Sequence, residues 1–232
     1  MVVNNVVAIA QARLGSTRLK NKMLMHLNGY SIIEWVYLRL CNSKLLNEIV
    51  FAIPDNKEND LLDCYLKKIG ANVFRGSESD LVQRYIDAAN YYEATHVVRV
   101  CCDRPLISPE FIDELIQFYF SKNIDYAFNH VPLYDSNWPV GLGAEISHSS
   151  LIKTISKVTV KPDHREHLYN YIHENRGDFS ISTYQPSLSL SHPILKLDLD
   201  DQDDYKRLIE RNYKIDMSVD QVIKEALKET NV

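Results

Sequence analysis

The chain has 232 residues, with 31 acidic side chains against 26 lysines and arginines and a net charge of −5. Nucleic-acid-binding proteins usually carry a basic excess, and a membrane span needs about 20 consecutive apolar residues, so neither class fits this composition. The short apolar run at 6–10 lacks the cationic lead-in of a signal peptide, and we therefore expect a cytoplasmic protein with no nucleic-acid or membrane partner.

Strand-like and helix-like segments alternate through the first 130 residues. Continuous apolar runs predict strands at 6–10, 48–54, 72–75, 96–101 and 125–129. Capping signals and helical periodicity predict helices at 31–40, 58–69, 77–92 and 108–120. This alternation predicts an α/β fold with a doubly wound, mainly parallel sheet flanked by helices. In such sheets, ligands bind at the carboxyl ends of the strands.

The residues beyond 130 show a looser pattern, without a linker that would separate two domains. Strands are predicted at 144–146, 179–183 and 194–199, and helices at 163–175, 201–211 and 218–228. Asp163 and Glu166 form the capping box that is expected to open the first of these helices. The last helix is amphipathic, and it could pack on its own domain or on a second copy in a homodimer.

The loop after the first predicted strand concentrates positive charge. Arg13, Arg18, Lys20 and Lys22 lie within ten residues of an otherwise acidic chain. Backbone amides of the small residues at 15–17 can face an oxyanion, while the cations neutralise its charge. The loop matches neither the P-loop pattern nor the glycine pattern of dinucleotide sites. A solvated basic loop is the alternative, but the position at the end of the first strand favours phosphate binding.

Aspartates follow two of the later strands. Asp103 comes directly after the strand at 96–101 and is a natural magnesium ligand beside a phosphate site, although it could instead pair with the arginine that follows it. The acids at 201–204 fit the cap and first turn of a helix. Asp198 and Asp200 precede that cap and share one face of a predicted strand, so they remain free for a metal ion.

The predicted helix start at 163–166 carries side chains that suit an anionic acceptor molecule. Helix starts attract anions, and Arg165 is therefore a candidate contact for an acidic acceptor. Glu166 is expected to act as part of the cap. His164 and His167 could supply a base, but an isolated histidine is more often structural.

These motifs, in this order along the chain, resemble a known family. The segments 10–22 and 103–107 resemble the cytidylyltransferases that activate acidic sugars, such as the 3-deoxy-manno-octulosonate and N-acylneuraminate enzymes. They are most similar to the spore coat polysaccharide biosynthesis protein F branch. Supporting matches lie at 74–85, 141–145, 165–167 and 199–204. The resemblance implies a Rossmann-like fold of the nucleotide-diphospho-sugar transferase type.

The resemblance also implies one nucleotidyltransferase domain over 1–232, with a nucleotide-binding core at 1–130 and acceptor-side and C-terminal elements at 131–232. Its nucleotide-binding residues would be Ala10, Ala12, Arg13, Gly15, Ser16, Lys22, Ser77 and Arg84. Within this set, Arg13, Ser16 and Lys22 would hold the triphosphate, and the loop backbone from 10 to 15 would read the base.

The remaining implied roles concern catalysis and the acceptor. Asp103 and Asp200 would hold Mg²⁺, and with Arg13 and Lys22 they would form the catalytic set. The acceptor-binding residues would be Glu145, Arg165 and His167.

The implied reaction is the magnesium-dependent transfer of CMP from CTP to a sugar or sugar-like acceptor, with release of pyrophosphate, for bacterial surface polysaccharide or glycan biosynthesis. Cys102, Val140 and the segment 201–204 depart from the family pattern, and the acceptor stays open between an ulosonic acid, a sugar phosphate and a smaller phosphorylated compound. Two other classes also stay open. One is a glycosyltransferase that uses Asp198-Leu199-Asp200 as its metal site, and the other is a non-catalytic nucleotide-binding relative.

Overall fold

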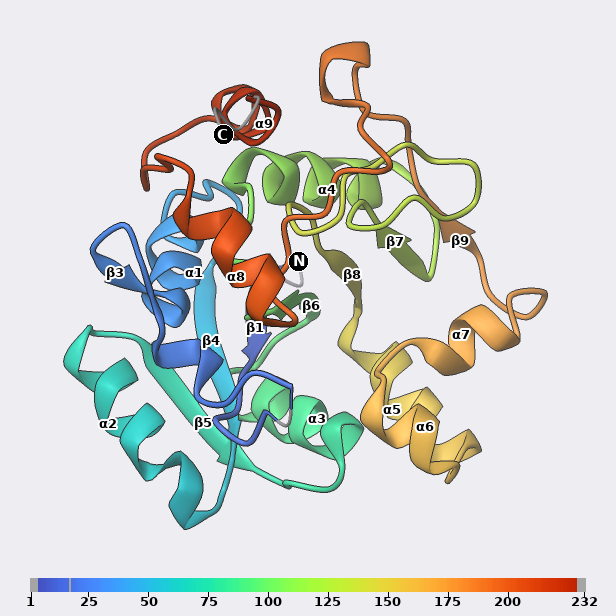
Figure 1. Ribbon diagram of the computed structural model, residues 1–232. Coiled ribbons are helices and arrows are strands. Elements are labelled where there is room, and N and C mark those ends of the chain that lie inside the picture. Colours follow the sequence, from blue (N-terminus) through green and yellow to red (C-terminus); the bar gives the residue numbers. More distant parts are fainter. Residues whose placement is uncertain (1–3, 17, 229–232) are drawn as a thin grey trace.

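The computed structural model describes residues 4–16 and 18–228, and Figure 1 shows them as a sheet enclosed by helices. Within these residues, seven strands form one sheet in the order β5–β4–β1–β6–β8–β7–β9. In that order the strands are β5 (Asn72–Gly76), β4 (Glu48–Pro54), β1 (Val6–Gln11), β6 (His96–Cys101), β8 (Glu145–His148), β7 (Tyr126–Phe128) and β9 (Ile181–Ser182). A separate antiparallel pair joins β2 (His26–Leu27) to β3 (Tyr30–Ser31).

The sheet is mainly parallel, which confirms the predicted fold class. β1 pairs in parallel with β4 on one side and with β6 on the other, and β4 pairs in parallel with β5. β8 runs antiparallel to both of its neighbours, β6 and β7. The apolar run at 6–10 is buried throughout because β1 lies inside the sheet, with side chains facing a packed layer on each side.

Helices cover both faces of the sheet. The α-helices are α1 (Ile32–Leu40), α2 (Asp60–Lys68), α3 (Leu81–Tyr91), α4 (Pro109–Ser121), α5 (Ser149–Val158), α6 (Pro162–Glu166), α7 (Asn170–Glu174), α8 (Gln202–Ile209) and α9 (Val219–Ala226). One face packs against α1, α2 and α4, and the other packs against α3, α5 and α7. A third cluster joins α8 and α9 to α1 and the start of α4, so the apolar face of α9 is buried on its own chain.

The helix starts mostly follow the predicted capping chemistry. Capping boxes form at α1, α8 and α9, where they pair Ser31 with Glu34, Asp201 with Asp204, and Ser218 with Gln221. At α3 the cap is Asp80 itself, and the Ser77 hydroxyl accepts a hydrogen bond from the Asp80 amide at 3.1 Å. Among the helices that the structure describes, none is long and apolar enough to cross a membrane.

Two predictions for the later residues are wrong. The helix expected at 163–175 is divided into α6 and α7, because Pro162 starts α6 early and residues 167–169 form a turn. Asp163 therefore lies inside the first turn of α6 instead of capping it, and its carboxylate accepts a hydrogen bond from Asn170 Nδ2 at 2.8 Å. Residues 194–199, all of them described, join the β-structure only through one bridge between Lys196 and Val140.

A close backbone contact fixes the loop between β7 and β8. The Asn129 side chain is fully buried; its Nδ2 donates to the Phe111 carbonyl at 2.8 Å, and its Oδ1 accepts from the Ala144 amide at 2.9 Å. A Cβ at Gly143 would lie only 2.0 Å from the Asn129 carbonyl oxygen. Only glycine can occupy this position without moving the backbone at Asn129 or at residue 143.

Gly143→Ala should therefore destabilise the protein by about 1–3 kcal/mol, the usual range for overpacking a tight interior site. The matched control is Gly177→Ala, since a Cβ at Gly177 would meet nothing within 4 Å. Urea unfolding of the two variants would measure the difference. Equal stability of the two variants would contradict the close contact.

Candidate active site

A cavity of about 540 Å³ opens at the carboxyl ends of β1 and β6. This is the edge at which open parallel sheets bind their ligands. Its walls come from the loop after β1, the start of α3, the end of β6 and the end of α6. The lining residues are Gln11, Ala12, Arg13, Ser16, Arg18, Lys22, Met23, Glu78, Ser79, Leu81, Arg84, Cys101, Cys102, Asp103, Glu166 and His167.

Buried contacts of Leu14 anchor the basic loop, and the arginines of the loop, Arg13 and Arg18, are exposed. Leu14 is buried, and its amide donates to the buried Asn59 side chain at 3.0 Å. The Ser16 hydroxyl accepts from the Leu19 amide at 3.3 Å, which closes a turn inside the loop. Arg13 remains exposed at the cavity, as expected of a group that meets a charged ligand.

Lys22 lies between the two aspartates that the sequence assigns to a metal ion. Its ammonium is 3.2 Å from Asp103 Oδ2 and 3.8 Å from Asp200 Oδ1, and it donates to the Leu199 carbonyl at 2.9 Å. The Leu199 amide in turn donates to the Asp103 carbonyl at 2.7 Å. These contacts bring together segments that lie about 80 and 180 residues from Lys22 along the chain.

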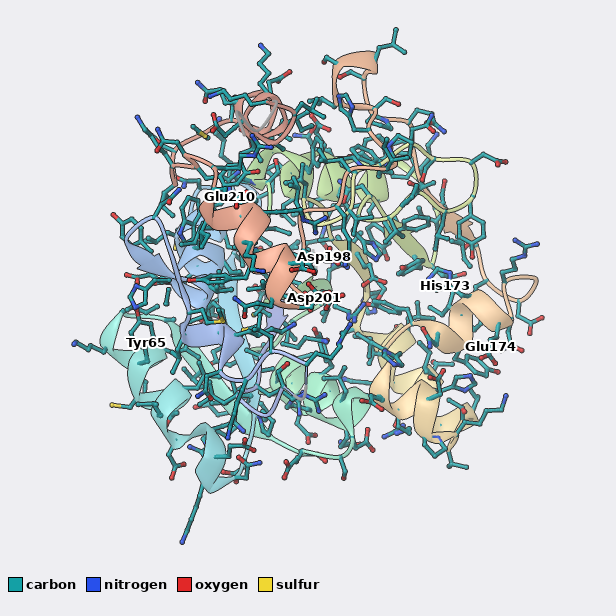
Figure 2. The ribbon with its side chains drawn as sticks, in the orientation of Figure 1. Tyr65, His173, Glu174, Asp198, Asp201 and Glu210 are labelled. Carbon is teal, nitrogen blue, oxygen red and sulfur yellow. The ribbon has the colours of Figure 1, made fainter. Side chains whose placement is uncertain are left out.

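A second layer of charge fixes the position of Asp200. The buried carboxylate of Asp204 accepts hydrogen bonds from the Asp200 amide at 2.8 Å and from the Asp201 amide at 3.2 Å. Lys196 lies 3.6 Å from Asp200 Oδ2 and 3.4 Å from Asp204 Oδ2. Figure 2 shows Asp198 and Asp201 together beside the start of α8. The Asp200 backbone is therefore set by the capping box of α8.

Asp198 lies in the same group of acids but is more deeply enclosed. Burial raises its pKa, and its Oδ1 makes no hydrogen bond, although the Lys196 ammonium is 3.6 Å away. Gly141 has a φ of +101°, and a Cβ there would lie 2.7 Å from the Asp198 amide nitrogen. The close approach of the Gly141 loop therefore holds the backbone that carries these aspartates.

The start of α3 forms the opposite wall of the cavity. Arg84 belongs to this wall, and its guanidinium donates to the Ser77 carbonyl at 2.5 Å. Burial lowers the pKa of Arg84. Arg165 does not line the cavity; its Nε donates to Asp80 Oδ2 at 3.0 Å and its guanidinium also contacts Ser156 at 2.9 Å. Arg165 therefore joins α6 to the cap of α3.

A buried polar network lies beside the cavity, on the α3 side of the sheet. Glu145 is ion-paired with Arg99, accepts a hydrogen bond from the Tyr126 hydroxyl at 2.5 Å, and has His130 Nε2 4.0 Å away. Burial alone would raise the pKa of Glu145, but its interactions with Arg99, His130, Tyr126 and Arg104 together outweigh burial, and the pKa falls to about 2. Burial also lowers the pKa of His130 to about 3. Glu145 is thus a charged, enclosed group that holds Arg99.

The structure brings most of the expected site residues to one place. Of these, the cavity lining contains Ala12, Arg13, Ser16, Lys22, Arg84, Asp103 and His167. Asp200 joins them through Lys22, whereas the lining does not include Ala10, Gly15, Ser77, Glu145 or Arg165. The roles assigned to these residues stay predictions.

The sequence marked Gln11 only as part of the stretch 10–15, and Glu78, Ser79 and Leu81 only as part of the matched stretch 74–85, whereas Cys101 carried no site signal. Gln11 and Cys101 end two neighbouring parallel strands, and Glu78, Ser79 and Leu81 surround the start of α3. Strand alternation could have placed Gln11 on the α3 side of β1, with Val7 and Ile9. It could not have shown that this side reaches the cavity.

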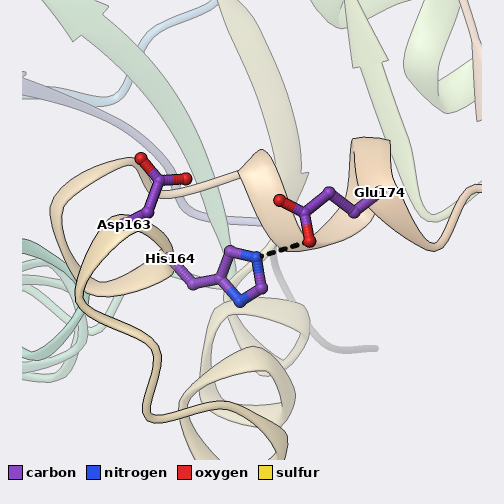
Figure 3. A group of neighbouring side chains, drawn as sticks. All are labelled: Asp163, His164 and Glu174. Atoms are coloured by element: carbon purple, nitrogen blue, oxygen red, sulfur yellow. Dashed lines mark ion pairs between the residues drawn. The ribbon is translucent and has the colours of Figure 1, made fainter.

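A second ionisable group lies on α6 and α7 (Figure 3). His164 Nε2 is 2.9 Å from Glu174 Oε2, and its Nδ1 is 2.7 Å from the Thr159 hydroxyl. Donor atoms of Asp163, His164 and Glu174 lie within 4.8 Å of one another, so the group could hold a cation. Asp163 and Glu174 are exposed, however, and the group does not line the cavity. His164 is thus a buried side chain that links α6 to α7 through its contact with Glu174.

Comparisons with known proteins agree over nearly the whole chain. A sequence-family model described as cytidylyltransferase matches residues 7–231. An uncharacterized protein of Methanocaldococcus jannaschii is 32% identical over 212 residues, which cover 91% of this chain and 85% of that protein. The spore coat polysaccharide biosynthesis protein SpsF of Bacillus subtilis is 28% identical over 89% of this chain and 85% of its own length. The solved structure of a cytidylyltransferase from Leptospira borgpetersenii matches with a TM-score of 0.88 at 28% identity, covering 96% of this chain and 93% of that one.

The buried network predicts a loss of stability in mild acid. The pKa of His130 is about 3 in the folded protein against about 6.5 when unfolded, so the unfolded chain binds more protons below pH 6.5. Each pH unit from 6.5 toward 3 should then cost about 1.4 kcal/mol through this histidine. Urea unfolding at pH 7 and pH 5 should show a smaller difference for His130→Gln than for the parent protein. The control is His26→Gln, at an exposed histidine; identical pH dependence in all three proteins would contradict the assignment.

Proposed function

This chain belongs to the cytidylyltransferase family, and we propose that it transfers CMP from CTP to a sugar-type acceptor with release of pyrophosphate. The observation that carries the proposal is the convergence of Lys22 with Asp103 and Asp200 beside a basic loop. A nucleoside triphosphate needs cations along its phosphates and oxygen ligands for the metal ion that accompanies it. Both kinds of group meet at this cavity.

The sugar-type acceptor and the link to surface polysaccharide rest on relatives. The Bacillus subtilis protein that matches 89% of this chain is a spore coat polysaccharide biosynthesis protein. A 3-deoxy-manno-octulosonate cytidylyltransferase of Pelodictyon phaeoclathratiforme is 34% identical over half of this chain. We take a sugar-like molecule with a free hydroxyl or phosphate as the acceptor class.

The two aspartates fit a magnesium ion. The Lys22 ammonium already places a cationic atom 3.2 Å from Asp103 Oδ2 and 3.8 Å from Asp200 Oδ1, so both carboxylates converge on a position suited to a cation. Carboxylate oxygens are the ligands that Mg²⁺ prefers. Bound at these carboxylates, Mg²⁺ would neutralise charge on the phosphate oxygens.

The residues of this chain would act mainly by position and charge. An acceptor oxygen attacks the α-phosphorus, and a hydroxyl acceptor loses its proton to water. The bond to the bridging oxygen breaks, and the electron pair leaves with pyrophosphate. Arg13 and Ser16 would hold the β- and γ-phosphates from the loop, and Lys22 would move from its aspartates to the charge that grows on the leaving group. No covalent enzyme intermediate is needed, so holding the two substrates in line is the main task.

The acceptor would enter from the α6 side of the cavity. His167 and Glu166 line this side. Arg165 would act through α6, because its ion pair with Asp80 fixes the position of His167 relative to α3. Glu145 would likewise act through Arg99 and not by direct contact with the acceptor.

Lys22→Ala and Asp103→Asn should each keep the fold and lose turnover by about 10²–10³-fold, since each removes a charge that stabilises the transition state. Pyrophosphate release from CTP and Mg²⁺ would be measured against a panel of neutral sugars, sugar phosphates and ulosonic acids. Lys68→Ala, at an exposed lysine of α2, is the matched control. Near-normal turnover in either site variant would remove that residue from the mechanism.

A further inference from the structure

Gln11 ends β1 and lines the cavity, with its amide held in one orientation. Its Oε1 accepts a hydrogen bond from Arg99 Nε at 3.3 Å and lies 3.1 Å from the Tyr85 hydroxyl. An arginine Nε–H can only donate, so the oxygen of the Gln11 amide must face Arg99. The amide nitrogen must then point the other way.

Arg99 cannot turn away to release this amide. Its guanidinium is ion-paired with Glu145, which is almost fully buried and is itself held by the Tyr126 hydroxyl at 2.5 Å. Tyr85 is also fully buried, and its hydroxyl is 3.1 Å from the Ile9 carbonyl as well as from Gln11. Arg99, Glu145 and Tyr85 therefore fix the orientation of the Gln11 amide, so that its nitrogen faces the cavity.

The exposed end is a hydrogen-bond donor without a partner of its own. Among the residues that the structure describes, none accepts a hydrogen bond from Gln11 Nε2, although the oxygen of the same amide accepts from Arg99 Nε. A primary amide carries two N–H donors on this nitrogen. A ligand that presents an oxygen or nitrogen lone pair here would satisfy a donor that the fold has already oriented.

The distribution of charge in the cavity indicates which part of the ligand this is. The side chains of Arg13, Arg18 and Lys22 are concentrated on the loop, where a triphosphate would lie. Cys101 is the register partner of Gln11 across the sheet, and the start of α3 adds the uncharged Ser79 and Leu81 together with the charged Glu78 and Arg84. The uncharged part of CTP that carries hydrogen-bond acceptors is the cytosine base, through its carbonyl oxygen and ring nitrogen.

We propose that Gln11 is a specificity-determining residue that donates a hydrogen bond from Nε2 to the base of CTP. The inference rests on the proposed function, since it assumes that the cavity binds a nucleoside triphosphate. Arg99 and Glu145 are positioning residues in this account, because they hold the Gln11 amide and do not contact the nucleotide.

Two substitutions of Gln11 separate the donor from the shape of the side chain. Gln11→Met keeps the length and removes the donor. Gln11→Glu keeps an oxygen toward Arg99 and presents a second, negatively charged oxygen to the cavity in place of N–H. Calorimetric titration with CTP and Mg²⁺ should show affinity about tenfold weaker for Gln11→Met, as for loss of one neutral hydrogen bond, and weaker still for Gln11→Glu.

Inorganic triphosphate is the matched ligand, because it carries the phosphates of CTP without the base. Gln11→Met should bind it with Mg²⁺ as the parent protein does, which also shows that the variant is folded. Unchanged CTP affinity in Gln11→Met, or equal loss of CTP and triphosphate binding, would overturn the role of Gln11. Failure of the parent protein to bind CTP at all would instead overturn the proposed function.

Discussion

The ammonium of Lys22, held between Asp103 and Asp200, is the contact on which the site depends. It joins the loop after β1, the end of β6 and the segment before α8, which are far apart in the sequence. Two carboxylates this close repel each other, so a cation between them stabilises the arrangement. In the proposed mechanism, the same repulsion would favour a metal ion at these carboxylates, and Lys22 would then be free to contact the phosphates.

The rest of the fold keeps these three segments in place. Parallel pairing of β1 with β6 places their carboxyl ends side by side. The Gly141 loop packs against the backbone of Asp198 at a distance that a side chain could not tolerate, and Asp204 binds the Asp200 amide. The proposed acceptor side is built differently, since Arg99 and Arg165 are paired with the buried carboxylate of Glu145 and the capping carboxylate of Asp80.

Short-range patterns in the sequence predicted the features that depend on residues close together in the chain. The strands around β1, the basic loop at 11–22 and the capping box at Asp201 are such features, because periodicity and capping act within a few residues. The alternation of Leu195, Leu197 and Leu199 suggested a strand. Leu197 and Leu199 are buried in the cluster around α8 and α9, and Leu195 packs against it. The backbone of this segment makes one bridge, between Lys196 and Val140, so no strand forms. The ion pair of Arg165 with Asp80 spans 85 residues, and nothing near either residue identifies the other.

Thermal unfolding with CTP, UTP, GTP, ATP or a sugar nucleotide, each with and without Mg²⁺, tests the central claim most directly. A nucleotide at 100 times its dissociation constant stabilises the folded state by about 2.7 kcal/mol, which is readily measured. The account predicts a stabilisation by CTP that requires Mg²⁺ and is lost in Asp103→Asn. Stabilisation by a sugar nucleotide, with none by any triphosphate, would contradict it.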